Sequence, residues 1–159
     1  MRHARWQRRA LAVCGYRMDI TPELRERIKT AVEAGPFTRH VGLVVEAIEE
    51  GYVRARLPFR EVLVRSYGIH HGGAILTLMD VASGVASSSA HEGAYDPGVT
   101  NVTIAASTQF MGTAPGKDLV AEASCTKSGK TISFVDVEVR ADAELVAKGS
   151  FTFKVTRVG

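Results

Sequence analysis

Residues 67–88 read YGIHHGGAILTLMDVASGVASS and decide the fold. A glycine-containing loop leads into a segment whose apolar residues recur every three or four positions, as on one face of a helix. Leu76 and Met79 add apolar surface to its other sides, and a helix that is apolar nearly all round is typical of a buried core. The segment is too short and too interrupted by Gly and Ser to cross a membrane. We therefore predict a buried central helix with strands packed around it.

The start of this helix carries two glycines, Gly72 and Gly73, although glycine lowers helix stability. Without a Cβ, glycine lets another group come close to the backbone. The first amides of a helix have no partner within it, and the helix dipole places partial positive charge there. A developing oxyanion would fit this position.

The middle of the helix carries an acid, Asp80, within the apolar sequence LTLMDVA. Burying a carboxylate without a partner is costly, so such a residue is commonly paired or functional. A side chain that reaches solvent, or that makes a structural hydrogen bond, is the alternative, and the spacing does not decide between them. Gly72 and Asp80 are eight residues apart, roughly 12 Å along a helix, so one helix cannot aim both at one carbonyl. Two antiparallel copies across a two-fold axis could, which predicts a homodimer with two equivalent interface sites.

Several short patterns in the chain resemble one enzyme family. HGGAILTLMD at 71–80 is followed by TQFMGTAPG at 108–116 and SGKT at 128–131. The first pattern resembles the H-G-G-(x)6-D signature of the PaaI-like hotdog-fold acyl-CoA thioesterases, and the similarity extends from about Gly35 to the C-terminus. The resemblance implies an α+β hotdog fold, in which an antiparallel sheet wraps around a long central helix. It also implies a homodimer at minimum, which we expect to pair into a dimer of dimers.

The family's activity is hydrolysis of an acyl- or aryl-acyl-CoA thioester to the free acid and CoA. The resemblance places the oxyanion at the Gly72 amide and His71 beside the thioester, although His71 could also be purely structural. Asp80 of the other subunit would be the general base or the nucleophile. When Phe110 is aligned with the family's strand aromatic, Thr103 falls where relatives hold the attacking water. An ordinary β-branched strand residue is the alternative for Thr103.

One position departs from the family pattern. An Asn often stands a few residues before H-G-G in this family, whereas Arg65 and Ser66 stand there in this chain. The departure keeps open a second function from another class, a non-catalytic acyl-CoA-binding or sensing protein. The intact Asp80 favours the enzyme. The chain has no G-x-S-x-G elbow, which disfavours a serine hydrolase.

Substrate binding needs groups for the phosphates of coenzyme A, which is part of the substrate and not a separate cofactor. We predict Lys130 for this task, with backbone donors from Ser128 and Gly129; a solvated turn lysine is the alternative. Gly73 is predicted to contact substrate at the helix start. No metal site is predicted, because the adjacent histidines at 70 and 71 lack ligand spacing and accompanying carboxylates or cysteines.

The rest of the chain predicts one helix and six strands. Thr21 and Pro22 start a helix that Gly35 ends, and it lies over the sheet or the substrate tunnel. The alternation of apolar and polar residues predicts half-buried strands. These strands cover residues 43–49, 52–58, 99–110, 119–127, 131–140 and 145–158.

Composition bounds the remaining questions. The 159 residues suit one domain, which we place at 18–159 after a basic, disordered tail at 1–17. The formal charge of +3 lies largely in that tail, which argues against nucleic acid as a partner. Two cysteines, Cys14 and Cys125, form no disulfide or zinc pattern, so we expect a cytoplasmic protein. No segment predicts membrane insertion.

Overall fold

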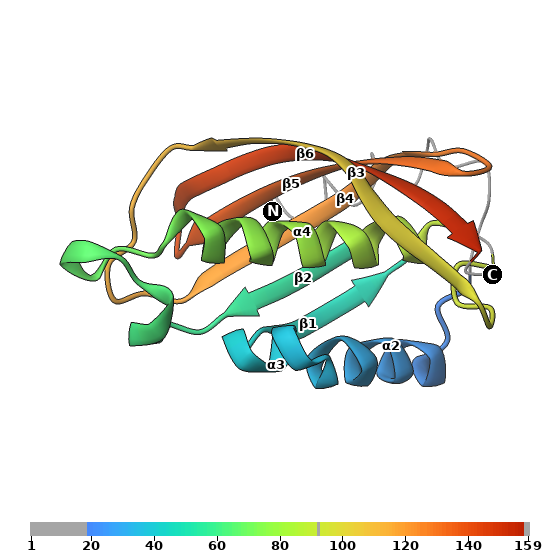
Figure 1. Cartoon of the computed structure of the whole chain (residues 1–159), viewed down its shortest axis with the longest axis horizontal. Helices are drawn as coiled ribbons and strands as arrows, with labels where there is room; N and C mark the ends of the chain where they lie inside the picture. Colours follow the sequence, from blue (N-terminus) through green and yellow to red (C-terminus); the bar gives the residue numbers. More distant parts are fainter. Residues whose placement is uncertain (1–18, 92, 158–159) are drawn as a thin grey trace.

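The computed structural model describes residues 19–91 and 93–157. Six antiparallel strands form one sheet in the order β1-β2-β4-β5-β6-β3, and the sheet curls around helix α4 (Figure 1). This arrangement confirms the predicted α+β hotdog fold. The predicted tail at 1–17 and residue 158 lie outside the described residues. The strands are β1 Val44–Glu49, β2 Tyr52–Leu57, β3 Val99–Phe110, β4 Leu119–Ser128, β5 Ile132–Ala141 and β6 Glu144–Arg157, and the helices are α2 Pro22–Ala34, α3 Pro36–Val41 and α4 Gly72–Ser89, with single 3-10 turns at η1 Glu61–Leu63 and η2 Ser66–Gly68.

Helix α4 supplies the centre of the core. Its residues Leu78, Met79 and Ala82 have no exposed surface and pack against the inner face of the sheet. Burying one Leu or Met side chain contributes about 1.5–3 kcal/mol, so this face alone anchors the helix. In the described part of the chain no helix is long and apolar enough to span a membrane.

One stripe of α4 faces away from the sheet. Gly73, Leu76, Thr77, Asp80 and Gly84 are spaced three or four residues apart, and each is exposed or half-buried. Leu76 keeps 39% of its surface exposed. The composition of the helix predicts burial on all sides. In a single chain, however, one side of the helix is open to solvent.

Strand β3 forms one edge of the sheet and is the most open strand. Val102, Ile104 and Phe110 are 44%, 52% and 54% exposed. A bulge between residues 103 and 105 shifts the pairing with β6. The alternation that predicts one apolar face therefore breaks in the middle of the strand. Gly149 permits the close pairing, because a Cβ there would lie 2.5 Å from the carbonyl oxygen of Ser107.

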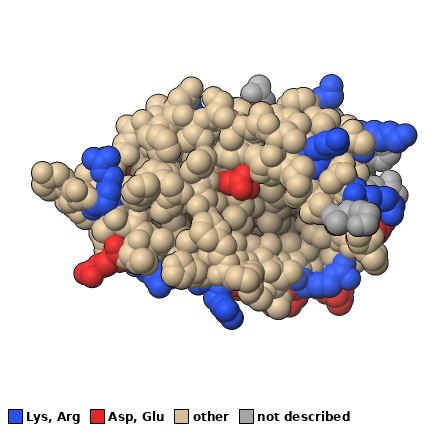
Figure 2. Space-filling model, viewed as in Figure 1, with Lys and Arg blue, Asp and Glu red and all other residues tan. Residues whose placement is uncertain are grey.

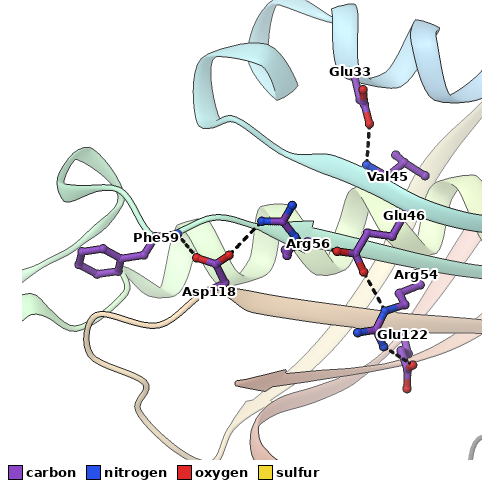
Figure 3. Close-up of polar contacts among 8 residues, drawn as sticks. All are labelled: Glu33, Val45, Glu46, Arg54, Arg56, Phe59, Asp118 and Glu122. Atoms are coloured by element: carbon purple, nitrogen blue, oxygen red, sulfur yellow. Dashed lines mark hydrogen bonds and ion pairs between the residues drawn. The ribbon is translucent and has the colours of Figure 1, made fainter. Parts of the chain in front are cut away.

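The outer face of β1, β2 and β4 is polar and internally paired (Figure 3). Arg54 forms ion pairs of 2.8 Å with Glu46 and with Glu122. Arg56 pairs with Glu46 at 2.7 Å and with Asp118 at 2.9 Å. Charged side chains on this face thus have partners within the chain.

Helix α2 lies along the β1 edge (Figure 1). Thr21 caps its start as predicted, accepting a hydrogen bond from the Leu24 amide at 3.2 Å. The Glu33 carboxylate accepts a hydrogen bond of 2.8 Å from the backbone amide of Val45 (Figure 3). Because that amide is on β1, the bond fixes the end of α2 to the sheet.

Candidate active site

The start of α4 is capped by the imidazole of His71. Its Nδ1 accepts a hydrogen bond of 2.9 Å from the Gly73 amide, so a neutral ring carries its proton on Nε2. A Cβ on Gly73 would lie 3.0 Å from that Nδ1, so glycine leaves room for the cap. Within the described residues, the Gly72 amide has no acceptor. At the start of α4, the Gly73 amide therefore has an acceptor, whereas the Gly72 amide can still donate a hydrogen bond to a ligand.

Asp80 and Thr103 form a hydrogen-bonded pair. The Thr103 hydroxyl donates to Oδ1 of Asp80 at 2.7 Å, although the two residues belong to α4 and β3. Asp80 is half-buried. In the part of the chain that is described, its other oxygen, Oδ2, receives no hydrogen bond. A carboxylate held on one side and open on the other is suited to accept a proton from water.

Asn101 holds β3 against α4 one turn beyond this pair. Its Nδ2 donates to the carbonyl oxygen of Gly84 at 2.8 Å. Asn101 lies two residues before Thr103 on the same strand, so the bond restrains the strand that carries the hydroxyl. The sequence pattern alone does not predict this role for Asn101.

A groove of about 390 Å³ begins at Asp80 and Thr103. Its walls come from α2, α4, β3 and β6, and it includes Tyr95 of the loop after α4. The face that carries α4 and β3 is hollowed in its centre and mostly uncharged around an acidic patch, with Lys and Arg at its ends (Figure 2). Helix α2, which the sequence predicts to lie over the sheet or over the substrate tunnel, forms one wall of this groove.

The start of α4 does not reach the groove of its own chain. Gly72 and Gly73 are not among the residues that line it, and about 12 Å of helix separates Gly72 from Asp80. Leu76 lies midway between them on the open stripe of α4. One chain therefore holds two halves of the predicted constellation, the amide and the carboxylate, without bringing them together.

The predicted phosphate-binding residues lie elsewhere. Ser128 is buried, with its hydroxyl 3.5 Å from that of Ser133, and the Gly129 amide donates to the Ile132 carbonyl at 2.8 Å. Lys130 borders a separate recess of about 690 Å³, which Lys154 and Arg157 also line. The turn 128–130 thus presents its lysine to a basic recess, while its backbone donor at 129 is already used.

Arg65 lies in a tight loop before the helix. Its amide donates to the Ile69 carbonyl at 2.8 Å. Tyr67 at the tip has a φ of +66° and is 91% exposed, a conformation that costs free energy in a residue other than glycine. Within the described residues, no group of three or more His, Cys, Asp or Glu side chains could hold a metal ion. That the protein has no metal site is still a prediction.

Two residues that line the groove, Arg27 of α2 and Tyr95, are not predicted from the sequence. The charged face of α2 resembles any solvated surface. Tyr95 is the one aromatic residue in the polar connection 89–98, and that is the signal that could have singled it out.

Comparison with known proteins places this geometry in a family. The family described as the thioesterase superfamily matches residues 67–148. Human acyl-coenzyme A thioesterase 13 is 32% identical over 140 residues, covering 84% of this chain and 95% of the human protein. A conserved protein of Pseudomonas aeruginosa is 29% identical with a TM-score of 0.73, over 79% of this chain and 98% of its own. The E. coli PaaI protein from the phenylacetic acid degradation operon has a TM-score of 0.72 at 20% identity, over 84% of this chain and 92% of its own, which shows the fold alone.

The chain belongs to the thioesterase superfamily, and it shares its fold with the PaaI protein. It is accordingly a thioester hydrolase, as its H-G-G-(x)6-D pattern predicts.

Proposed function

We propose that this protein hydrolyses acyl-CoA thioesters to the free acid and CoA, at two sites of a homodimer. One observation carries the proposal, namely the Asp80–Thr103 pair at the mouth of a largely apolar groove. Similarity to human acyl-coenzyme A thioesterase 13 supports coenzyme A as the thiol component.

The dimer follows from what one chain leaves open. The open stripe of α4 and the apolar side chains of β3 form an exposed apolar surface on one face, and such surfaces are typical of interfaces. A two-fold axis near Leu76 would lay two α4 helices antiparallel. Gly72 of the partner subunit would then stand opposite Asp80, because Leu76 is midway between the two positions. The two-fold axis would thus create two equivalent sites, each with Asp80 from one subunit and the Gly72 amide from the other.

The chemistry divides between the two subunits. The thioester carbonyl accepts a hydrogen bond from the Gly72 amide of the partner subunit, whose helix dipole stabilises the tetrahedral oxyanion. Thr103 orients a water molecule, and Asp80 removes its proton as the water oxygen attacks the carbonyl carbon. Collapse of the oxyanion breaks the carbon–sulfur bond, and the CoA sulfur takes the proton from Asp80. Direct attack by Asp80 through an anhydride is the other route.

The remaining groups hold the substrate. His71 caps the helix and keeps its first turn in place, while Gly73 lets substrate approach the backbone. Lys130, presented by the turn that contains Ser128 and Gly129, supplies positive charge for the phosphates of CoA. We place the protein in the cytoplasm, where acyl-CoA is abundant, and expect two dimers to pair.

A non-catalytic acyl-CoA-binding protein is the second candidate. It is favoured by Arg65, which stands where related sequences often carry an Asn. The hydrogen-bonded Asp80 favours hydrolysis, since a binding protein has no need of an oriented carboxylate beside the acyl groove.

Release of free thiol from octanoyl-CoA and phenylacetyl-CoA tests the function. Asp80→Asn keeps the side-chain shape and should lower kcat by about 10²–10⁴-fold. Asp136→Asn is the matched control, because Asp136 also accepts a hydroxyl hydrogen bond, from Ser150 at 2.8 Å, but on the outer face. Equal turnover by wild type and Asp80→Asn would remove the catalytic assignment, and tight binding without turnover would establish the second candidate.

A further inference from the structure

The far end of the groove holds an unsatisfied polar group. The Tyr95 hydroxyl is buried, and among the residues that the structure describes it has no hydrogen-bond partner. Ser88 of α4 lines the groove as well, and its hydroxyl lies near enough to affect the pKa of Tyr95. A buried hydroxyl without a partner costs free energy, so the phenol needs an acceptor that the described residues do not supply.

The middle of the groove is apolar. Side chains of Ile28 and Val32 from α2, Val81 and Val85 from α4, and Phe153 from β6 line it. Eight residues separate Asp80 from Ser88, which is roughly 12 Å along the helix. The groove therefore offers a hydrocarbon-lined passage of medium length between the carboxylate and the phenol.

Arg27 brings positive charge to the same end. It lines the groove, and in the described residues its guanidinium forms no ion pair. Burial raises the pKa of Tyr95, and the smaller effects of Ser88 and of the Arg27 charge oppose this rise. The hydroxyl thus keeps its proton at neutral pH and can donate it to an acceptor.

We infer that the acyl group carries an oxygen acceptor at its far end, a hydroxyl or a carboxylate, which binds the Tyr95 hydroxyl while Arg27 adds affinity for the carboxylate. This inference rests on the proposed acyl-CoA hydrolysis. It goes beyond it by assigning the end of the acyl chain to named residues. Plain alkanoyl chains of the same length would fill the groove and leave the phenol unsatisfied.

Three CoA thioesters of equal chain length test the inference. They are octanoyl-CoA, 8-hydroxyoctanoyl-CoA and the CoA monothioester of octanedioic acid. Wild-type kcat/KM should be about tenfold higher for either oxygenated substrate than for octanoyl-CoA, which is the discrimination expected from one hydrogen bond to a buried donor. This measurement needs no variant, so a folding failure cannot obscure it.

Variants assign the preference to its residues. Tyr95→Phe should reduce the tenfold ratio for the hydroxyl substrate to about one and should also lower the ratio for the carboxylate, whereas Arg27→Gln should lower the ratio for the carboxylate alone. Tyr52→Phe is the matched control, because the Tyr52 hydroxyl is paired with Glu122 at 3.1 Å on the outer face. It should leave both ratios as in wild type.

The outcomes separate the inference from the function on which it rests. Hydrolysis of octanoyl-CoA at least as fast as of the oxygenated substrates, with Asp80 still required, would overturn the inference and leave the thioesterase intact. Ratios unaltered by Tyr95→Phe would overturn the assignment to the phenol. Absence of turnover on all three substrates would overturn both.

Discussion

Two hollows of nearly equal size, about 390 and 400 Å³, lie on opposite faces of the sheet. Each holds an aspartate that accepts a hydrogen bond from a hydroxyl, Asp80 from Thr103 in the groove and Asp136 from Ser150 on the outer face. Their surroundings differ. The outer hollow is bordered by Glu138 and other charged side chains, whereas the surface that lines the groove is mostly apolar. A hydrogen bond between a carboxylate and a hydroxyl therefore does not by itself mark an active site. What distinguishes the Asp80–Thr103 pair from the Asp136–Ser150 pair is the apolar lining of the groove beside it.

The two faces also differ in how complete they are. On the outer face, Arg54 and Arg56 find their acids within one chain. On the α4 face, Leu76 and Ile104 are 39% and 52% exposed, and the Gly72 amide lies about 12 Å from the carboxylate that it would serve. The charged groups of the first face are paired within a single chain, whereas the site on the second face is, in our proposal, completed by another copy.

The largest expected effect comes from breaking the open face. Ile104→Asp places a charge on the exposed part of β3 and should convert the dimer into monomers with no measurable turnover, since burying an unpaired carboxylate at an interface is costly. Phe134→Asp is the control, because Phe134 is 45% exposed on the outer face. Light scattering and thiol release measure both proteins. A dimeric, active Ile104→Asp would mean that this face is not the interface.

The next effect concerns the two hydroxyl–carboxylate pairs. Thr103→Val keeps the shape of the side chain and removes the donor to Asp80, so kcat should fall about 10–100-fold through loss of a charge-assisted hydrogen bond. Thr103→Ser should retain most activity. Ser150→Ala, which removes the equivalent donor on the outer face, should leave kcat unaltered. Steady-state kinetics of the three variants would contradict the comparison if Ser150→Ala lowered kcat as much as Thr103→Val.

The smallest effect lies in the outer ion pairs. A hydrogen bond from the Phe59 amide, followed by the Arg56 ion pair, holds the pKa of Asp118 below its usual 3.8 (Figure 3). Because the folded-state pKa is the lower one, the carboxylate contributes stability above the unfolded-state value, and this contribution is lost as the pH falls through the folded-state pKa. Asp118 is largely solvated, so Asp118→Asn should cost at most about 1 kcal/mol at neutral pH.

Urea unfolding from neutral pH to about pH 3 measures this difference. The stabilities of wild type and Asp118→Asn should converge in acid, with turnover at neutral pH unaltered. A difference that stays constant over this range would show that Asp118 acts through packing and not through its charge.

Local patterns predict much of this architecture. Periodicity of three to four places α4 in the core, and alternation places the strands within a residue or two of their ends. The proximity of Thr103 to Asp80, 23 residues apart in sequence, follows from the family resemblance and not from either pattern. The bulge in β3 is not visible in composition, because it depends on pairing with β6.

The groove is harder to predict than the Asp80–Thr103 pair. Its outer wall is α2, whose apolar stripe predicts packing but not the element on which it packs. Tyr95 stands in a loop, where its burial depends on contacts made far along the chain. The roles of Gly72 and Lys130 stay predictions, because they require a second chain and a bound substrate.

The bond between Glu33 and the Val45 amide has an evolutionary consequence. It attaches α2 to the backbone of β1, while Asn101 attaches β3 to the backbone of α4. On the proposed function, the wall of the acyl groove and the strand that carries Thr103 are thus attached separately, each by one side chain, Glu33 or Asn101, that bonds to a main-chain group. Substitutions along α2 other than at Glu33 should therefore alter the groove without displacing Thr103, so substrate preference can diverge in this fold while the hydroxyl–carboxylate pair is kept.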